Sequence, residues 1–190
     1  MRQSDPGNLT YSGYYSGPGS ITKFGPGLKE NQTTYLDNDY DFSYKPMGVA
    51  DRISKEHDFT QETTIHQPQG WLEDVRTLPS DHVLLDESED ALFDMTVAKI
   101  AGHSNTPTED YVRISKMTAF FSMVIAYKEW KYNEMLKRGL DPDSHRDQNK
   151  IIIDDWQPSS MSGKIAKLIL EMSGPKNKRG EVKPIAQKQP

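Results

Sequence analysis

Residues 49–60 read VADRISKEHDFT. Val49, Ile53 and His57 recur at the spacing of one helix face in this stretch. The pattern predicts a helix over about 48–63 whose apolar side carries the His57 ring.

Further helices are predicted along the rest of the chain. The second covers about 80–101, with Ser80 as its N-cap and Gly102 at its end. A third begins at the capping-box pattern Thr106–Glu109 and runs to Arg138, and a last amphipathic helix covers 159–172. The three isoleucines at 151–153 are expected to form a short strand. The expected class is therefore mainly α.

The N-terminal quarter, residues 1–48, has a different composition. It holds more than half of the glycines, including two Gly-Pro-Gly triplets at 17–19 and 25–27. Such composition is typical of loop with little regular structure.

The overall composition excludes several classes of site and partner. The chain has 190 residues and no cysteine, so disulfides, thiolate metal sites and a cysteine nucleophile are excluded. The net charge is -5; residues 174–190 carry +4 and are expected to be disordered, which leaves -9 on the rest. An acidic body is a poor match for nucleic acid and a better one for a metal cation. We find no transmembrane stretch and no Sec-type signal in this sequence.

The pair His57-Asp58 is the first candidate for chemistry. Adjacent residues of a helix point about 100° apart, so the two side chains face different parts of the protein. A histidine oriented by a carboxylate can act as a general base on water, while Asp58 could bind a hard cation. Alternatively, the pair is a half-buried histidine beside a surface aspartate.

The second candidate is the loop Tyr15-Ser16-Gly17-Pro18-Gly19. Glycine backbones can turn their carbonyls toward Ca2+, and their amides can hold an oxyanion. An ordinary glycine-rich turn is the alternative interpretation.

A carboxylate to orient His57 is expected on the second helix. Of its aspartates, Asp81 alone falls on the apolar seam, where an imidazole N–H would be a suitable partner. Asp94 is the second choice for this role, and a simple helix-dipole contact at Asp81 is the other explanation.

Taken together, the order of these motifs resembles the phospholipase A2 superfamily. Residues 51–58, DRISKEHD, are similar to its active-site helix, written D-x-C-C-x-x-H-D in secreted members. The cysteine-free form looks more like the parvoviral-capsid and bacterial-toxin branches, as do the Gly-Pro-Gly core of the loop and the short interval from His57 to Asp81. The family usually has Tyr where this chain has Gln61. The resemblance covers about residues 11–100.

The resemblance implies a fold and a set of roles. It implies an antiparallel helix pair with a glycine-rich calcium loop in a catalytic region 1–104, followed by a helical extension, 105–173, and the basic tail. His57 would activate water and Asp81 would orient it. Ca2+ would be bound by Asp58 and by carbonyls of Tyr15, Gly17 and Gly19, with residues 23–27 as the alternative loop. The reaction implied is hydrolysis of the sn-2 ester of a glycerophospholipid at a membrane surface.

Other expectations concern context and competing functions. The resemblance implies a toxin or effector module, secreted or delivered without a Sec signal, with a cognate immunity protein and a larger delivery protein as partners. A non-catalytic membrane- or partner-binding helical module is the main alternative. A zinc hydrolase is the third interpretation, and it would use the histidines His57, His66, His82 and His103.

Overall fold

The structure is a computed structural model that describes residues 45–64, 74–103 and 108–173. Within these ranges the chain is helical and contains no strand, so the predicted mainly-α class is confirmed. The elements are α1 (Val49–Thr64), η1 (Val75–Thr77), α2 (Leu78–Ile100), α3 (Thr108–Lys137), α4 (His145–Gln148), η2 (Ile153–Asp155) and α5 (Met161–Ser173). The predicted calcium loop and the basic tail lie outside the described residues.

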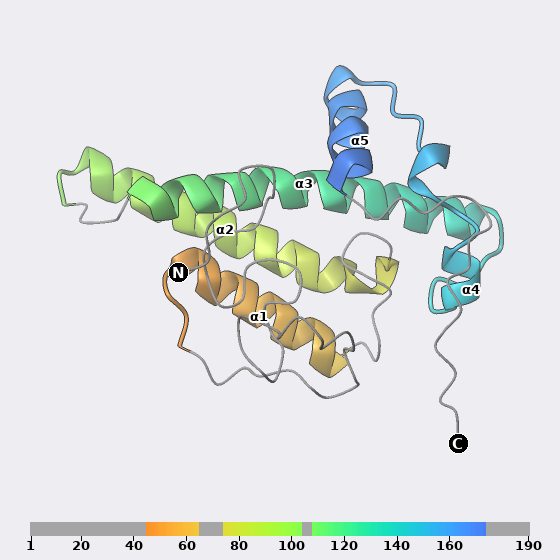
Figure 1. The fold of residues 1–190 in the computed structure, drawn as a ribbon, viewed down its shortest axis with the longest axis horizontal. Helices are drawn as coiled ribbons and strands as arrows, with labels where there is room; N and C mark the ends of the chain where they lie inside the picture. The colour runs from red at the N-terminus through yellow and green to blue at the C-terminus, as the bar shows by residue number, and fades with distance from the viewer. Residues whose placement is uncertain (1–44, 65–73, 104–107, 174–190) are drawn as a thin grey trace, which may run out of the picture.

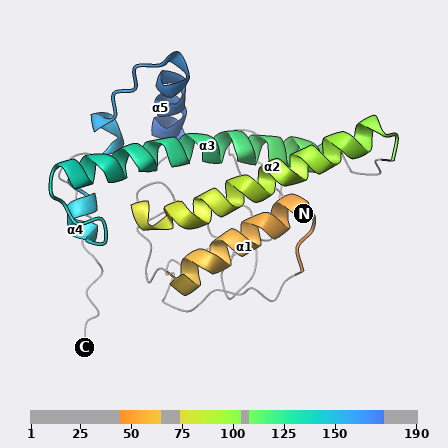
Figure 2. The same ribbon diagram turned by 180° about the vertical axis from the view of Figure 1, so that it is seen from behind.

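Three long helices form the body of the molecule. Figures 1 and 2 show α1 and α2 running antiparallel as neighbours, with the long α3 lying along α2. Figure 1 also shows α5 standing across the middle of α3, on the side away from α1. Helices α1 and α2 both contact α3, so the packing brings residues from both sides of the expected 104/105 boundary together.

The start of α2 differs from the prediction. The helix begins at Leu78 with Thr77 as its N-cap, and Pro79 occupies its first turn, where proline loses no helical hydrogen bond. Ser80 is therefore inside the helix, and its buried hydroxyl donates to the Thr77 carbonyl at 2.8 Å. The prediction of Ser80 as the N-cap is wrong. Proline is tolerated both in the first turn of a helix and just before an N-cap, so Pro79 by itself does not indicate where the helix begins.

The expected strand at 151–153 is also wrong. Ile151 is fully buried against Val75 and Met135, and the chain then turns into the 3-10 helix η2. The described residues offer no strand for these isoleucines to pair with, so their backbone bonds close locally. Ile152 N–H, for instance, donates to the Asp155 carboxylate at 3.2 Å.

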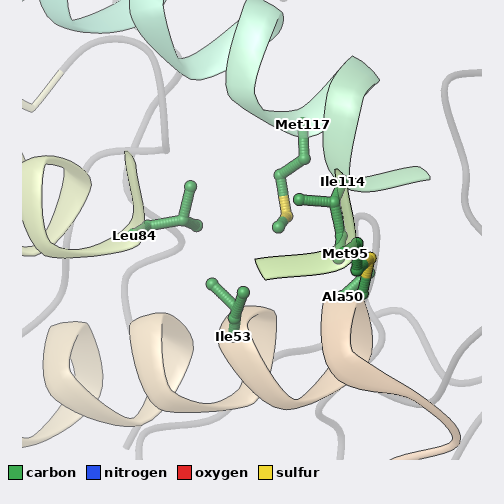
Figure 3. Close-up of a cluster of buried hydrophobic side chains, with 6 residues drawn as sticks. All are labelled: Ala50, Ile53, Leu84, Met95, Ile114 and Met117. Atoms are coloured by element: carbon green, nitrogen blue, oxygen red, sulfur yellow. The ribbon is translucent and has the colours of Figure 1, made fainter. Parts of the chain in front are cut away.

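The first core cluster joins all three long helices. Figure 3 shows side chains of α1, α2 and α3 converging in the space between these helices. The cluster consists of Ala50, Ile53, Leu84, Met95, Ile114 and Met117. This packing fixes the position of α1 along the axis of α2. It therefore also fixes the relative positions of the polar residues that follow Ile53 on α1 and precede Leu84 on α2.

Two further clusters lie farther along α3. One joins α3 to α5 through Val124, Tyr127, Trp156, Ala166 and Leu170, and the Tyr127 and Trp130 rings stack at 5.9 Å between centroids. The other contains Val75, Met135 and Ile151. Because α3 contributes to every cluster, it is the central helix of the described structure.

Candidate active site

His57 lies on the buried side of α1, one turn after Ile53. Its side chain is 5% exposed, and its ring packs edge-on against Phe121 of α3, with 5.1 Å between the centroids. Apolar contacts therefore fix the plane of the ring, and its two nitrogens can face different groups.

The Nε2 atom of His57 faces Asp81 in the first turn of α2. Nε2 lies 2.8 Å from Asp81 Oδ1, and the Asp81 side chain is fully buried. Gln61, one turn after His57 on α1, places its Nε2 atom 2.9 Å from the same ring nitrogen and donates to Asp81 Oδ1 at 3.4 Å. The structure thus brings together the two residues to which the sequence assigns the base and its orienting carboxylate.

The second oxygen of Asp81 is held from α3 and from the end of η1. The ammonium group of Lys128, itself fully buried, lies 2.5 Å from Asp81 Oδ2 and also donates to the Thr77 hydroxyl. The Thr77 hydroxyl lies 3.2 Å from Oδ2. Both carboxylate oxygens are therefore hydrogen-bonded, as a buried charge requires.

The charges around Asp81 favour its ionised form. Burial works to raise the pKa of Asp81, but the hydrogen bond from His57 and the charge of Lys128 outweigh it, and the pKa falls below its ordinary value. An ionised carboxylate only accepts hydrogen bonds, so the proton between Oδ1 and the ring belongs to Nε2. A protonated Nε2 cannot accept from the Gln61 amide nitrogen 2.9 Å away, so this amide nitrogen donates to Asp81 Oδ1 and not to the ring. The lone pair of a neutral His57 is then on Nδ1.

Asp58 lies beside this second nitrogen. Its Oδ1 is 3.4 Å from His57 Nδ1, and its side chain is 24% exposed. Burial and the nearby charge of Asp51 raise the pKa of Asp58, against the opposing effect of His57. Burial lowers the pKa of His57, but the hydrogen bonds with Asp58 and Asp81 outweigh it and the pKa is raised. A carboxylate disfavoured by its surroundings in this way would gain from a bound cation.

A cavity of about 290 Å³ opens between α1 and α2 next to His57. Its apolar walls include Ile53 and Leu84, with the exposed side chains of Phe59 and Val83 also lining it. Glu56, Thr60, Ser80 and Glu87 complete the lining. The histidine therefore borders a hollow with apolar walls and a few polar groups, as small-molecule sites generally do.

The remaining predicted site residues are distributed as follows. Tyr15, Gly17 and Gly19, and the alternative loop at 23–27, lie outside the described residues. Asp94 is exposed on α2, away from the buried contact that Asp81 makes. Across residues 45–64, 74–103 and 108–173, no group of three metal-binding side chains gathers.

The histidines of the zinc interpretation do not converge either, as far as they are described. His82 is half exposed and lies 3.2 Å from Glu129, and His103 is exposed after the end of α2. His57 has Asp81 on one nitrogen and Asp58 near the other. His66 is outside the described residues.

Sequence reasoning missed Lys128, Thr77 and Gln61 as members of the site. Lys128 has a visible signal, because it interrupts the stretch 117–130 of α3, which is otherwise apolar on nearly all sides. A lysine there must either reach solvent or find a buried anion. Gln61 and Thr77 carry no comparable signal, since their role depends on where α1 and α2 meet.

Comparisons with family models, with curated proteins and with solved structures found no match to this chain. The function therefore has to be argued from the geometry of the site.

Proposed function

We propose that this protein is a calcium-dependent phospholipase that hydrolyses the sn-2 acyl ester of glycerophospholipids. The observation that carries the proposal is the orientation of His57. Its Nε2 is bound to a buried, ionised Asp81, and its Nδ1 is left beside Asp58. This is the arrangement of a base that activates water, because the orienting carboxylate holds the ring in one tautomer.

The residues of the chain support each proton transfer. His57 Nδ1 takes a proton from a water molecule, and the oxygen of that water attacks the ester carbonyl carbon. Asp81 stabilises the imidazolium that forms while remaining ionised. When the tetrahedral intermediate collapses, the same Nδ1–H protonates the leaving oxygen, so a free fatty acid and a lysophospholipid result. No nucleophilic side chain is needed, which agrees with a chain that lacks cysteine.

Of the ligands that this proposal assigns to Ca2+, only Asp58 lies within the described residues. Asp58 is a hard oxygen ligand, partly exposed beside the base, and its raised pKa marks a carboxylate that a cation would stabilise. The further ligands in this proposal are the carbonyls of Tyr15, Gly17 and Gly19. When bound there, Ca2+ would supply Lewis-acid polarisation of the ester carbonyl and of the phosphate.

The cavity supports a substrate with an apolar chain. Ile53, Leu84 and the exposed Phe59 and Val83 line the hollow next to His57. An acyl chain placed against these side chains would bring its ester toward the ring. Membrane phospholipid is therefore the substrate class that we propose.

The test is release of fatty acid from mixed phospholipid vesicles labelled at the sn-2 chain, with Ca2+ and with EGTA. We expect calcium-dependent release by the wild type and none by His57→Ala or Asp58→Asn. His82→Ala is the matched control, because His82 is half exposed on α2, contacts Glu129 and does not line the cavity. Calcium-independent release, or equal release by His57→Ala, would overturn the proposal.

A second candidate function is suggested by the outer face of α5. Met161, Ile165, Leu168 and Met172 are all more than half exposed and recur at helical spacing. Lysines follow this helix in the sequence, and residues 174–190 carry +4. A non-catalytic module that lies on anionic lipid through this face is the alternative proposal. None of the helices in the described ranges is long and apolar enough to cross a membrane.

Vesicle co-sedimentation separates the two functions. A binding module would lose lipid binding when the four α5 residues are changed to Gln, and would keep it in His57→Ala. The control replaces Val97 and Ile100 with Gln, because both are exposed apolar residues on α2. Hydrolysis that disappears in His57→Ala while binding persists identifies an enzyme. Delivery as a toxin or effector, with an immunity protein and a larger delivery protein, stays a prediction from the resemblance.

A further inference from the structure

The cavity beside His57 has two carboxylates in its lining, which we call the acidic rim: Glu56 of α1 and Glu87 of α2. Both side chains are partly exposed, whereas the His57 ring is buried. Among the described residues that line this cavity, none is a lysine or an arginine. A ligand that fills the cavity therefore meets negative charge at the rim, which favours a cationic group over an anionic one.

A single guanidinium group holds the two carboxylates of the rim together. Arg52 Nη1 donates to both oxygens of Glu56, at 2.9 and 3.1 Å, and to Glu87 Oε2 at 3.3 Å. Arg52 itself does not line the cavity. Two carboxylates and one guanidinium carry one net negative charge, so the group of three would gain from a further cation on its cavity side.

The antiparallel arrangement of α1 and α2 places this rim at a definite distance from the candidate base (Figure 1). Arg52 meets Glu87 across the two helices, and His57 meets Asp81. Five residues on α1 and six on α2 separate these two contacts, which is about 8 Å at the rise of an α-helix. The glycerophosphate part of a phospholipid can span such a distance. An ester placed at His57 would therefore have its head group beside the rim.

We propose that Glu56 and Glu87 are specificity-determining residues that select phospholipids with a primary ammonium head group, as in phosphatidylethanolamine. This inference rests on the proposed function, because it places the ester at His57. A primary ammonium group has a positive charge and three N–H donors, so it can donate to both carboxylates. A trimethylammonium group has the charge without a donor. A glycerol head group has no positive charge, and its phosphate is repelled by the rim.

The first experiment is an internal competition with Ca2+ present. Vesicles contain equal amounts of phosphatidylethanolamine and phosphatidylglycerol with the same acyl chains, and mass spectrometry measures the two lysophospholipids. Because both lipids share one surface, the overall attraction of the protein to the membrane cancels, and the product ratio reports the ratio of kcat/KM values. We expect the wild type to release more lysophosphatidylethanolamine. With phosphatidylcholine in place of phosphatidylethanolamine, we expect a smaller preference.

Substitutions in the rim should move this ratio in opposite directions. Glu87→Gln leaves one carboxylate against one guanidinium, so we expect the preference for phosphatidylethanolamine to fall about 2- to 5-fold, the range of a partly exposed ion pair. Arg52→Gln leaves both carboxylates to the head group, so we expect the preference to rise. A general loss of structure would not produce opposite effects. Glu89→Gln is the matched control, because Glu89 is exposed on α2 and does not line the cavity.

A second readout needs neither Ca2+ nor hydrolysis. Decylammonium, decyltrimethylammonium and decyl sulfate are titrated into the calcium-free protein below their micelle concentrations, while NMR follows the methyl groups of Ile53 and Leu84 in the cavity wall. We expect decylammonium to bind most tightly and decyl sulfate most weakly. Glu87→Gln should weaken the binding of decylammonium and not that of decyl sulfate.

The two readouts separate this inference from the proposed function. Calcium-dependent hydrolysis with equal release from the two lipids, or with a ratio that Glu87→Gln leaves unchanged, would overturn the head-group inference and leave the phospholipase proposal standing. Absence of hydrolysis together with binding of decylammonium through Glu87 would overturn the phospholipase proposal, and the preference of the cavity for an ammonium group would stand. Absence of both would overturn both.

One further outcome would assign the rim to the metal. If Glu87→Gln raises the Ca2+ concentration that hydrolysis requires and leaves the product ratio unchanged, the two carboxylates bind the cation and not the head group. That result would also overturn the inference.

Discussion

Asp81 shows most directly how one buried side chain can join several parts of the molecule. It is fully buried, yet its carboxylate receives hydrogen bonds from α1 through His57 and Gln61 and from α3 through Lys128. These partners hold its pKa below the ordinary value of 3.8, despite the opposing effect of burial. Asp81 therefore links three helices through one ionised group.

This shift has a measurable consequence for acid stability. Because the pKa of Asp81 is lower in the folded than in the unfolded protein, the unfolded state binds more protons at acid pH. The contribution of Asp81 is fully present above the unfolded pKa, and is lost as pH falls below 3.8 through the folded pKa. We expect the difference in free energy of unfolding between the wild type and Asp81→Asn to shrink over that interval, as measured by urea denaturation.

The control for this prediction is Asp86→Asn, an exposed aspartate on the same helix. It makes the same change of side chain at an exposed position of α2. A constant difference between the wild type and Asp81→Asn across the acid range would contradict the shift.

Two apolar residues of α1, Ile53 and Phe59, differ strongly in burial. Ile53 is 1% exposed in the first core cluster, whereas Phe59 is 51% exposed beside the cavity. We expect Ile53→Ala to lower the free energy of unfolding by about 2–5 kcal/mol, and Phe59→Ala to change it by about 0.5 kcal/mol or less. Chemical denaturation measures both, and a larger loss for Phe59→Ala would mean that the α1 face is assigned wrongly.

At the scale of elements, the start of α5 depends on a close approach. A Cβ atom at Gly163 would lie 2.5 Å from Cβ of Pro158, so the 157–160 segment would have to move. Replacing glycine by alanine inside a helix normally adds about 0.5–1 kcal/mol of stability. Here the overlap should reverse the sign, because overpacking costs about 1–3 kcal/mol.

We therefore expect Gly163→Ala to lower the melting temperature. The control is Ser162→Ala, whose exposed side chain lies in the same turn. An increase in melting temperature for Gly163→Ala would show that residues 157–160 can move aside without a loss of stability.

At the scale of the whole molecule, α3 unites parts that the sequence seemed to separate. The first cluster joins residues from Ala50 to Met117, and the second joins α3 to α5. Gln148 in α4 adds a polar link, because it accepts from Val75 N–H and donates to Asp74, each at 3.1 Å. Contacts of this kind cross the expected boundary between a catalytic region and a helical extension.

Cooperative unfolding should follow from this arrangement. We expect tryptophan fluorescence, which reports the α3–α5 cluster through Trp130 and Trp156, and far-ultraviolet circular dichroism to give coincident denaturation curves. Trp71→Phe removes the tryptophan that lies outside the described residues. Two separated transitions would instead mean that α5 and its cluster unfold independently of α1 and α2.

The sequence by itself determined the helical class, the helix that carries His57, and the face of α2 that carries Asp81. These depend on periodicity, which is a local property: one apolar residue per turn marks the buried side, and a charged residue on that side needs a partner. The same locality explains the errors at Ser80 and at 151–153. Propensity alone could not distinguish an N-cap from a residue in the first turn of a helix, or a strand from a buried bend.

Only the tertiary structure decided which groups complete the site. The pairing of Lys128 with Asp81 joins residues 47 positions apart, and depends on how α3 lies against the start of α2. The contact of His57 with Asp81 likewise requires the antiparallel crossing of α1 and α2 that the first core cluster sets. The packing of apolar side chains from different helices sets these distances. The spacing of residues along a single helix cannot predict them.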